Sequence, residues 1–341
     1  MAAVASASAM SQAFAAASPP PNWVESRHPL GWAIDRLLTI EPLRQLMFWQ
    51  ARRLIIRTAE GRGIAWRQRR QQLLAAAEPL LADSTDAAVT APAYYRARFH
   101  AYTEGNLCWQ AACEAEQATD SMALRVWPGE PGLDPAAAQQ RLRTAIFAAI
   151  EPSLKGPLAR ALDLGCSVGV GTLALRDWLL ERCLAQGMSG AGDAPSVEGL
   201  DLSAEMLAVA RVREAEQQGA SPPIRWHHAA AEATGLPAGS YNLITLQFVC
   251  HELPQAATAA VLAEAARLLL PGGVIAVVDQ DPESPVIRRL PAPIATLLKS
   301  TEPYLEDYFR LDFAAALQAA GFHSVRCQAA DPRHRVLVAT R

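Results

Sequence analysis

The sequence predicts an α/β protein, in which a helical N-terminal region precedes a parallel sheet covered by helices. Two observations lead to this fold class. From about residue 136 onward, helical segments alternate with short apolar strands, as in a parallel sheet. Before that point, apolar residues recur at helical spacing. We therefore divide the chain into an N-terminal tail (1–21), a helical region (22–135) and an α/β domain (136–341).

The α/β domain is expected to begin with a helix at 136–150 and then to alternate strands with helices. A segment rich in Gly, Ala and Ser, 185–196, interrupts this order and is predicted to be a surface insertion. The motif Pro271-Gly272-Gly273 is predicted to stop a helix and to form a turn. The predicted strands are 159–164, 197–202, 224–228, 241–248, 274–279, 322–329 and 334–340, and the predicted helices are 171–184, 204–218, 256–270 and 312–320.

The composition is that of a globular protein and excludes several classes. Of the 341 residues, 51% are hydrophobic and 19% are charged. The formal net charge of −3 is too small for a polyanion-binding protein, so no nucleic-acid partner is expected. The six cysteines form no C-x-x-C pair and no cluster with zinc spacing, so no metal site is predicted. No apolar run reaches the roughly 18 residues of a transmembrane helix.

The tail is rich in Ala and Ser and carries no charge before Glu25. It lacks the basic start and the leucine-rich centre of a secretory signal. Two interpretations stay open: a plastid transit peptide, although this stretch has no arginine, or a disordered tail. A chloroplast location is predicted, with the cytoplasm as the alternative.

Seven arginines and one acid, Glu60, lie between Arg52 and Arg70. Such a segment is typical of a basic amphipathic helix that contacts an anionic membrane. The plainer interpretation is a solvated arginine face on an ordinary packing helix. Peripheral membrane contact through a basic helix at 52–70 is the hypothesis that follows from this pattern.

The strongest motif is ALDLGCSVGVGTLAL at 161–175, where an apolar strand, a glycine turn and a helix follow one another. Glycines allow a sharp turn and a close approach of a ligand, and the helix N-terminus favours a carboxylate. The spacing of Gly165, Gly169 and Gly171 differs from the dinucleotide pattern G-x-G-x-x-G. Asp163 before the turn suits an ammonium group better than a pyrophosphate. A ligand with both a carboxylate and an ammonium group is an amino acid.

A second motif, VEGLDLSAEML at 197–207, places Asp201 at the end of a strand and before a helix. A carboxylate at this position of an α/β sheet binds ribose hydroxyls, usually about 20 residues after the glycine loop. The predicted insertion at 185–196 accounts for the larger spacing here. Together with the first motif, this favours a ligand-binding role for Asp201 over an ordinary strand end.

These segments resemble the class I methyltransferases that use S-adenosylmethionine (SAM), in particular the broad group related to quinone-methylating enzymes. The resemblance covers about residues 136–341. It depends on DLGCSVGVG, GLDLSAEML, AEATGLPAGSYNLITLQFVCHELP and ARLLLPGGVIAVVD, in the order of the family. It implies a Rossmann-like sheet of seven strands with a reversed last strand. It also implies SAM as cofactor, whose methionine end is the amino acid expected at the glycine loop.

The resemblance implies roles for individual residues. The glycine loop would line the methionine end of SAM, Asp201 would bind the ribose, Leu202 and Met206 would flank the adenine, and Phe248 would lie under the cofactor. The residues implied for SAM binding are Asp163, Gly165, Cys166, Ser167, Gly169, Asp201, Leu202, Met206, Glu232 and Phe248.

The sequence departs from the family pattern at three places. Ser167 replaces the middle glycine of the loop. Ala230 replaces an acid of the adenine-binding segment, which leaves adenine recognition to backbone groups or to Glu232. Tyr241-Asn242 replaces the Phe-Asp that opens the fourth strand of the family.

The pair His251-Glu252 follows the fourth predicted strand and supplies the catalytic candidates. Methyl transfer mainly requires alignment of the reactants, and a base helps when the acceptor must lose a proton. Imidazole titrates in a suitable range. The alternative is that the pair caps the following loop. Asp279 and Asp281 reach the same edge of the sheet and are further candidates for substrate contact.

The segment AYYRARFHAYTEGNLCWQAACEAE at 93–116 mixes aromatic and polar residues. N-terminal helices form a substrate lid in some methyltransferases of this class, and such a mixture suits a lid. Ordinary helix packing with a glycine turn is the alternative. The segment also resembles uncharacterised plastid and cyanobacterial methyltransferases with a similar HAYxEGNLCW stretch. The lid candidates are Tyr95, His100, Tyr102, Asn106 and Trp109.

The sequence thus predicts an enzyme that transfers the methyl group of SAM to a small molecule. A quinone, a lipid-like compound or an isoprenoid-derived compound is expected by analogy with the family. Two alternatives are a non-catalytic SAM-binding regulatory or assembly protein and a nicotinamide-dependent oxidoreductase. The glycine spacing and Asp163 argue against the oxidoreductase.

Overall fold

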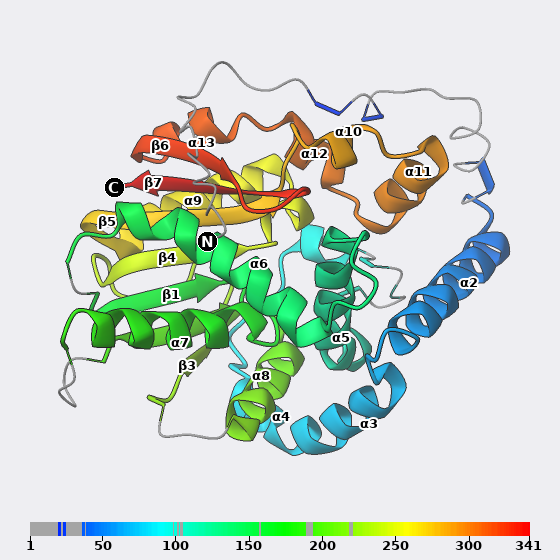
Figure 1. The fold of residues 1–341 in the computed structure, drawn as a ribbon, viewed down its shortest axis with the longest axis horizontal. Helices are drawn as coiled ribbons and strands as arrows, with labels where there is room; N and C mark the ends of the chain where they lie inside the picture. Colours follow the sequence, from blue (N-terminus) through cyan, green and yellow to red (C-terminus); the bar gives the residue numbers. More distant parts are fainter. Residues whose placement is uncertain are drawn as a thin grey trace, which may run out of the picture.

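Figure 1 shows the fold of the protein, taken from a computed structural model. Most of the tail at 1–21 and residues 189–193 of the expected surface insertion lie outside the described residues. None of the helices that the structure describes is long and apolar enough to cross a lipid bilayer. The structure describes residues 20–21, 23–24, 36–37, 39–97, 99–100, 102, 105–156, 158–188, 194–217 and 221–341.

The described residues of the α/β domain form one seven-stranded sheet in the order β3-β2-β1-β4-β5-β7-β6. Strands β1 to β5 are parallel, and β7 is antiparallel to both β5 and β6. This confirms the α/β fold with a reversed last strand. The strand order changes direction between β1 and β4, and ligands of such sheets bind at the carboxyl ends of the strands near this point. The strands are β1 (Arg160–Leu164), β2 (Ser196–Asp201), β3 (Arg225–His228), β4 (Tyr241–Gln247), β5 (Leu269–Gln280), β6 (His323–Ala329) and β7 (His334–Thr340).

Helices cover both faces of the sheet (Figure 1). α6 and α7 pack on one face, where Leu142 and Leu175 belong to one buried core. α9 and α13 pack on the other face, where Val261 and Leu317 belong to a second core. Because side chains of a strand alternate between the two faces, each central strand contributes apolar residues to both cores. The nearly continuous apolar sequence of these strands follows from this burial on both sides.

The helices of the domain begin and end within a few residues of the expected positions. Three short helices between β5 and β6 are absent from the sequence-based assignment, because prolines divide this stretch into pieces too short to show a helical period. The α-helices are α2 (Glu41–Glu60), α3 (Trp66–Ala77), α4 (Leu81–Ser84), α5 (Trp109–Val126), α6 (Pro135–Ile150), α7 (Val170–Ala185), α8 (Ala204–Glu216), α9 (Gln255–Leu268), α10 (Pro285–Arg288), α11 (Ala292–Thr301), α12 (Leu305–Arg310) and α13 (Phe313–Ala319). The short 3-10 helices are η1 (Glu78–Leu80), η2 (Ala93–Arg96), η3 (Glu151–Ser153) and η4 (Cys250–Glu252).

The expected turn at Pro271-Gly272-Gly273 is wrong. β5 begins at Leu269 and therefore includes this motif. The register between β4 and β5 shifts between Tyr241 and Leu243. The N–H of Gly272 donates to the carbonyl oxygen of Arg341 at 3.0 Å. The motif is thus a bulge in a strand. Its backbone groups form hydrogen bonds with Arg341, whereas a free turn would leave them exposed to solvent.

The single basic helix expected at 52–70 is also wrong. α2 ends at Glu60 and α3 begins at Trp66, with Gly63 at a φ of +86° in the turn between them. Several arginines of this segment bind acids of neighbouring helices, so the segment joins the helical region to α5 and α8 instead of forming one continuous basic face. Among the described residues, the ion pairs are Arg52 and Arg70 with Glu114, Arg69 with Glu116 and Glu216, and Arg67 with Glu60.

A buried carboxylate joins four of the strands. Glu198 of β2, whose side chain is 1% exposed, accepts bonds from Arg160 of β1 (2.6 Å), His227 of β3 (2.7 Å) and Tyr241 of β4 (2.9 Å). Burial alone would raise the pKa of Glu198, but the bonds from these three residues outweigh it and lower the pKa to about 2. The charged carboxylate therefore stabilises the fold.

We expect Glu198→Gln to lower the free energy of unfolding by about 2–3 kcal/mol at pH 7. The pKa of Glu198 is lower in the folded chain than its ordinary value of 4.5. Its contribution is therefore complete above about pH 4.5 and is lost as the pH falls towards 2. Urea unfolding at pH 7 and pH 3 measures both quantities. Glu181→Gln, on the exposed face of α7, is the control. An equal loss at both pH values would show that the charge is not the source.

Candidate active site

A tight loop joins β1 to α7 at the carboxyl edge of the sheet. Its backbone has positive φ at Gly165 (+72°), Ser167 (+49°) and Gly169 (+74°). The N–H groups of Gly165 and Cys166 donate to the carbonyl oxygen of Leu200 at 2.8 and 2.9 Å, which binds the loop to β2. Ser167 adopts a left-handed conformation that glycine adopts at lower cost. This explains why the family that the sequence resembles usually has a glycine at this position.

Two glycines of this loop make room for protein atoms. A Cβ on Gly165 would lie 2.6 Å from the side chain of Val249, just before η4. A Cβ on Gly169 would lie 2.6 Å from the indole of Trp226 on β3. Close packing of the loop is therefore a sufficient reason for these glycines. The expectation that they admit a ligand stays a prediction.

Asp163, near the end of β1, is 2% exposed, and three side chains hold its carboxylate. It accepts bonds from Thr172 of α7 (2.7 Å) and from Thr245 (2.6 Å) and Gln247 (3.2 Å) of β4. Burial raises the pKa of Asp163, and the three bonds act in the opposite direction. A carboxylate with three such bonds has little capacity left for an ammonium group. Its contact with a cofactor stays a prediction, whereas its structural role is to join β1, β4 and α7.

A buried cation that the sequence analysis missed faces this network. Arg143 of α6 is 7% exposed, and its guanidinium donates to Gln247 and lies 5.9 Å from the ring centroid of Phe248. Burial lowers the pKa of Arg143 to about 10, so it stays charged at neutral pH. Its Nε has no hydrogen-bond partner among the described residues. Position 143 gave no signal, because an arginine on an amphipathic helix is usually a solvated residue.

Asp201, at the end of β2, connects the glycine loop to the next helix. Its Oδ2 accepts the N–H of Ser167 at 2.7 Å, and its Oδ1 accepts the N–H of Ser203 at 2.9 Å. Ser203 caps α8 by accepting the N–H of Met206 at 3.2 Å, as the sequence predicted. Desolvation raises the pKa of Asp201 to about 6, although the two backbone bonds lower it. The residue is partly exposed, so its remaining lone pairs can accept bonds from ligand hydroxyls.

The remaining residues proposed for SAM binding differ in their burial and in their hydrogen-bond partners. The side chain of Cys166 is 4% exposed in a core with Leu207 and Trp226, so its proposed contact with the cofactor stays a prediction. Glu232 accepts a hydrogen bond from the hydroxyl of Tyr94, in the N-terminal region. Leu202, beside Asp201, has a carbonyl oxygen that accepts a bond from His228 at 2.9 Å. Met206 is 8% exposed and receives the hydroxyl of Ser167 on its sulfur at 3.4 Å.

His251, the proposed base, lies in η4 beside Asp279 of β5. Its Nδ1 lies 2.8 Å from Oδ1 of Asp279, and its backbone N–H donates to Oδ2 at 3.1 Å. Desolvation lowers the pKa of His251, but the carboxylates of Asp279, Glu302 and Glu252 outweigh it and raise the pKa to about 10. The imidazole is therefore cationic at neutral pH without a ligand. Asp279 is 0% exposed and orients His251, so it does not contact a substrate itself.

Glu252, the second catalytic candidate, is where the proposed lid meets the domain. Its Oε2 accepts bonds from the hydroxyl of Tyr95 (2.7 Å) and the amide of Asn106 (3.0 Å). His100 approaches from the same segment, with its Nε2 3.5 Å from Oε1 of Glu252. Residues that lie about 150 positions apart are thus brought together at the end of β4. The lid and catalytic candidates form one polar cluster.

Two lid candidates lie elsewhere. The hydroxyl of Tyr102 donates to Glu114 of α5 at 3.2 Å, and the guanidinium of Arg52 lies 5.1 Å from its ring centroid. Trp109 is the first residue of α5 and packs in the same helical core as Tyr102. Tyr102 thus joins α5 to α2, and Trp109 packs in a core shared with α8, so the proposed lid role of both residues stays a prediction. Asp281 also differs from its expected role, since its Oδ1 accepts the N–H of Glu283 and forms a turn.

Backbone strain is concentrated in these segments. Among the described residues, positive φ outside glycine occurs at His100 (+51°), Ser167 (+49°), Phe248 (+62°) and Ser324. Three of these four were singled out from the sequence as site residues. Strained residues persist only where their surroundings over-determine them, and such residues are concentrated at functional sites. The strain therefore supports a site that includes the glycine loop, the end of β4 and the segment of His100.

Residues 161–273 match a family model described as a methyltransferase domain. The match runs from β1 to the bulge of β5, and it includes the glycine loop, Asp201 and His251. It supports a class I methyltransferase domain in this part of the chain. No curated protein matches the sequence.

Solved structures of methyltransferases have a similar fold. Phosphoethanolamine N-methyltransferase 2 of Haemonchus contortus, in complex with SAM, is 16% identical with a TM-score of 0.41, and the match covers 58% of this chain and 52% of that one. A SAM-dependent methyltransferase of Aquifex aeolicus is 18% identical (TM-score 0.44; 64% and 97% covered). Magnesium protoporphyrin IX methyltransferase of Synechocystis PCC 6803, with bound SAM, is 15% identical (TM-score 0.41; 66% and 83% covered). The chain spans about half the length of the Haemonchus enzyme. Likeness at this level, with TM-scores below 0.5, supports no conclusion about function.

We expect Glu252→Gln to loosen the N-terminal segment from the domain, because the bonds from Tyr95 and Asn106 would lose their charged acceptor. Hydrogen bonds to charged groups contribute about 1.5–3 kcal/mol. Hydrogen–deuterium exchange of a peptide covering 93–108 should become faster by at least about tenfold, as a loss of 1.4 kcal/mol requires. Glu283→Gln, an exposed acid after β5, is the control. Unchanged exchange would show that the contact does not hold the segment.

Proposed function

We propose that this protein is a methyltransferase that uses SAM as methyl donor and a small molecule as acceptor. One observation carries the proposal. The methyltransferase-domain match at 161–273 contains two ligand motifs, and the bond between Asp201 and the N–H of Ser167 joins them at one edge of the sheet. A match to the family alone would leave open whether the two motifs are close enough to bind one ligand.

In this proposal, SAM lies along the carboxyl ends of β1, β2 and β4. Asp201 accepts the ribose hydroxyls with the lone pairs that its two backbone donors leave free. Leu202 and Met206 flank the adenine. Asp163 supports the glycine loop, since its carboxylate accepts hydrogen bonds from three side chains of the protein. The charged Arg143, behind the end of β4, favours the carboxylate end of the methionine.

The acceptor would reach the methyl group from the side of η4. His251 and Glu252 lie there, together with Tyr95 and His100 from the N-terminal region. Tyr95 also packs against the ring of Phe99, with 5.1 Å between the ring centroids. Aromatic rings beside polar groups suit an acceptor with an apolar ring and a polar substituent. A quinone, a lipid-like compound or an isoprenoid-derived compound has this character.

A second candidate is SAM binding without catalysis, in a regulatory or assembly protein. One observation favours it. Glu232 and Glu252, both proposed to face a ligand, are bonded to Tyr94 and Tyr95 of the N-terminal region. A protein of this kind would bind SAM but would form no S-adenosylhomocysteine with any acceptor.

Calorimetry with SAM, S-adenosylhomocysteine and NAD tests the proposed cofactor. SAM and S-adenosylhomocysteine should bind and NAD should not. Comparative metabolite profiling of a strain lacking the protein then tests the acceptor. The unmethylated substrate should accumulate in this strain, and its mass should be lower than that of the normal product by one methyl group. NAD binding without SAM binding would contradict the proposal, and SAM binding without turnover in a metabolite extract would favour the second candidate.

Asp201→Ala should weaken SAM binding by about 1–3 kcal/mol, because the ribose hydroxyls would lose their acceptor. The effect should also depend on pH. Bonds from hydroxyls favour the charged carboxylate, so SAM lowers the pKa of Asp201 from its value of about 6 in the free protein. Affinity is therefore complete above that pKa and decreases as the pH falls through it. Titration calorimetry between pH 7.5 and pH 5 would measure this.

Two variants control this experiment. Asp201→Asn has no titrating group at this position, so the decrease at acid pH should disappear. Asp83→Asn, at an exposed position of α4, should behave like the wild type. The same pH dependence in Asp201→Asn would place the ribose at another residue.

We also propose a peripheral membrane contact, with its centre on α2. Figure 1 shows α2 at the periphery, away from the sheet. Its apolar side chains Leu46 (48% exposed), Trp49 (55%) and Leu54 (66%) lie in solvent. Arg53 lies over the ring of Trp49, 5.2 Å from the centroid, and Arg57 is exposed one turn later. Exposed leucines and a tryptophan beside arginines suit the interface of an anionic bilayer.

Sedimentation with vesicles of phosphatidylglycerol and phosphatidylcholine measures this contact. Leu54→Glu should reduce the bound fraction several-fold, because it removes apolar area and adds a negative charge. Leu184→Glu, at a position of α7 that is 64% exposed, is the matched control. Equal binding of both variants and the wild type would contradict a role of α2.

A further inference from the structure

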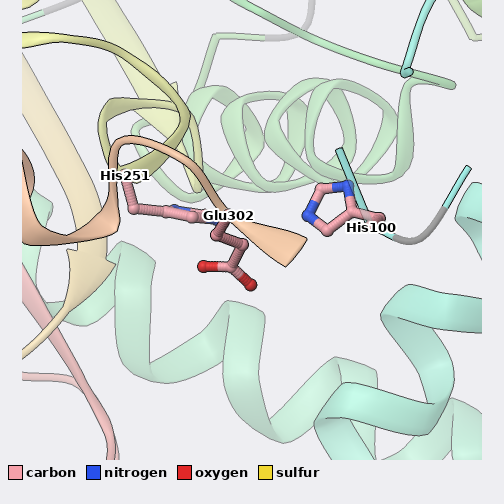
Figure 2. A group of neighbouring side chains, drawn as sticks. All are labelled: His100, His251 and Glu302. Carbon is pink, nitrogen blue, oxygen red and sulfur yellow. The ribbon is translucent and has the colours of Figure 1, made fainter. Parts of the chain in front are cut away.

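Two histidines and one glutamate from distant parts of the chain meet beside η4. Potential ligand atoms of His100, His251 and Glu302 all lie within 4.8 Å of one another. Figure 2 shows Glu302 between the two imidazoles, which come from opposite sides. The backbone N–H of His100 donates to the carbonyl oxygen of Thr301 at 2.8 Å, which fixes the two segments side by side.

Glu302 is a buried carboxylate with an unused atom. The residue is 8% exposed, and its Oε2 has no hydrogen-bond partner among the described residues. A buried ionised carboxylate costs several kcal/mol unless it is paired or binds a metal. The unused oxygen is therefore a candidate ligand atom for a metal ion.

His251 is oriented as a metal ligand would be. Asp279 holds its Nδ1 at 2.8 Å, so a proton on Nδ1 leaves the lone pair of Nε2 free for a ligand. Metal-bound histidines commonly donate their second N–H to a carboxylate in this manner, which fixes the tautomer and the ring. Asp279 is fully buried, and the ring cannot rotate without losing the bond between Nδ1 and Oδ1 of Asp279.

The charges around the cluster favour a cation. The carboxylates of Asp279, Glu252 and Glu302 surround two imidazoles, which carry no charge when they act as ligands. Tyr95 and Asn106 donate to Glu252 but bring no charge. A divalent ion would balance these carboxylates when both imidazoles act as neutral ligands.

We propose that His100, His251 and Glu302 bind a divalent transition-metal ion. Two nitrogens and one carboxylate oxygen suit zinc and related ions better than magnesium. Ligand atoms bound tetrahedrally at the usual distances lie about 3.4 Å apart, so the widest pair must close by at most about 1.4 Å from its limit of 4.8 Å. The side chain of His100 is 37% exposed, and its Nδ1 lies 3.0 Å from Oδ1 of Asn106, so closing the gap requires the two side chains to move together.

Three protein ligands leave at least one coordination position open. The three ligands lie beside η4, where the proposed function places the acceptor. The ion would bind an oxygen of the acceptor and orient it. The binding of the ion itself does not depend on the proposed methyl transfer.

Titration of the full chain with Co²⁺ tests the proposal, because Co²⁺ bound to nitrogen and oxygen ligands has a visible d–d spectrum. One ion per chain should bind, Zn²⁺ should displace it and Mg²⁺ should not. His100→Ala and Glu302→Gln should weaken binding by at least about tenfold, and Asp279→Asn by about 10–100-fold, the usual range for a residue that orients a ligand. His323→Ala, which removes an exposed histidine of β6, is the control.

Thermal unfolding of each variant, and calorimetric binding of SAM to each, separate this proposal from the proposed function and from loss of fold. Variants that fold and bind SAM but have lost the Co²⁺ spectrum support the metal site. Absence of a Co²⁺ spectrum in the wild type, or wild-type affinity in both His100→Ala and Glu302→Gln, would overturn it. Loss of SAM binding in a protein that still binds Co²⁺ would contradict the proposed function alone.

Discussion

The need to satisfy buried carboxylates at the carboxyl ends of the strands determines the shape of this edge of the sheet. Asp163 lies near the end of β1, Asp201 ends β2 and Asp279 lies near the end of β5, and each is held by donors of the protein. A buried carboxylate without donors would destabilise the fold by several kcal/mol. Some of these donors belong to the segments that follow the strands, so each carboxylate fixes a loop or the start of a helix. The glycine loop, the start of α8 and η4 are positioned in this way.

This constraint also explains why the loops can be strained. Ser167 has a left-handed backbone, which costs about 1–2 kcal/mol in a residue with a side chain. Its N–H donates to Asp201, which also accepts the N–H of Ser203. The strain at Ser167 is offset because relaxing it would remove a donor from the carboxylate of Asp201. Asp279 also fixes η4, because the N–H and the ring of His251 both bind it.

The helical region belongs to the site as well as to the scaffold. Arg69 of α3 binds Glu216 of α8, which joins this region to the domain on one side. Tyr95 and Asn106 bind Glu252, which joins it at the end of β4. A methyltransferase domain alone, from β1 onward, would lack the groups that surround η4. The acceptor and the proposed metal ion would therefore depend on residues that lie outside the family match.

The sequence by itself determined the α/β class, the order of the strands along the chain and the positions of the glycine loop, Asp201 and the pair His251-Glu252. These features are local, because a strand, a turn and a helix start each depend on residues that are close in sequence. Short-range periodicity and capping residues therefore predict them. The cap at Ser203 was predicted correctly for this reason.

Only the tertiary structure decided which of these residues meet. Pairing between distant strands made Pro271-Gly272-Gly273 a bulge, and packing directed Cys166 into the core. Arg143 and Glu302 gave no signal, because a single charged residue is ordinary in a sequence and becomes unusual only when it is buried. The contact of Tyr95 with Glu252 joins residues about 150 positions apart, and no local pattern encodes a distance between them.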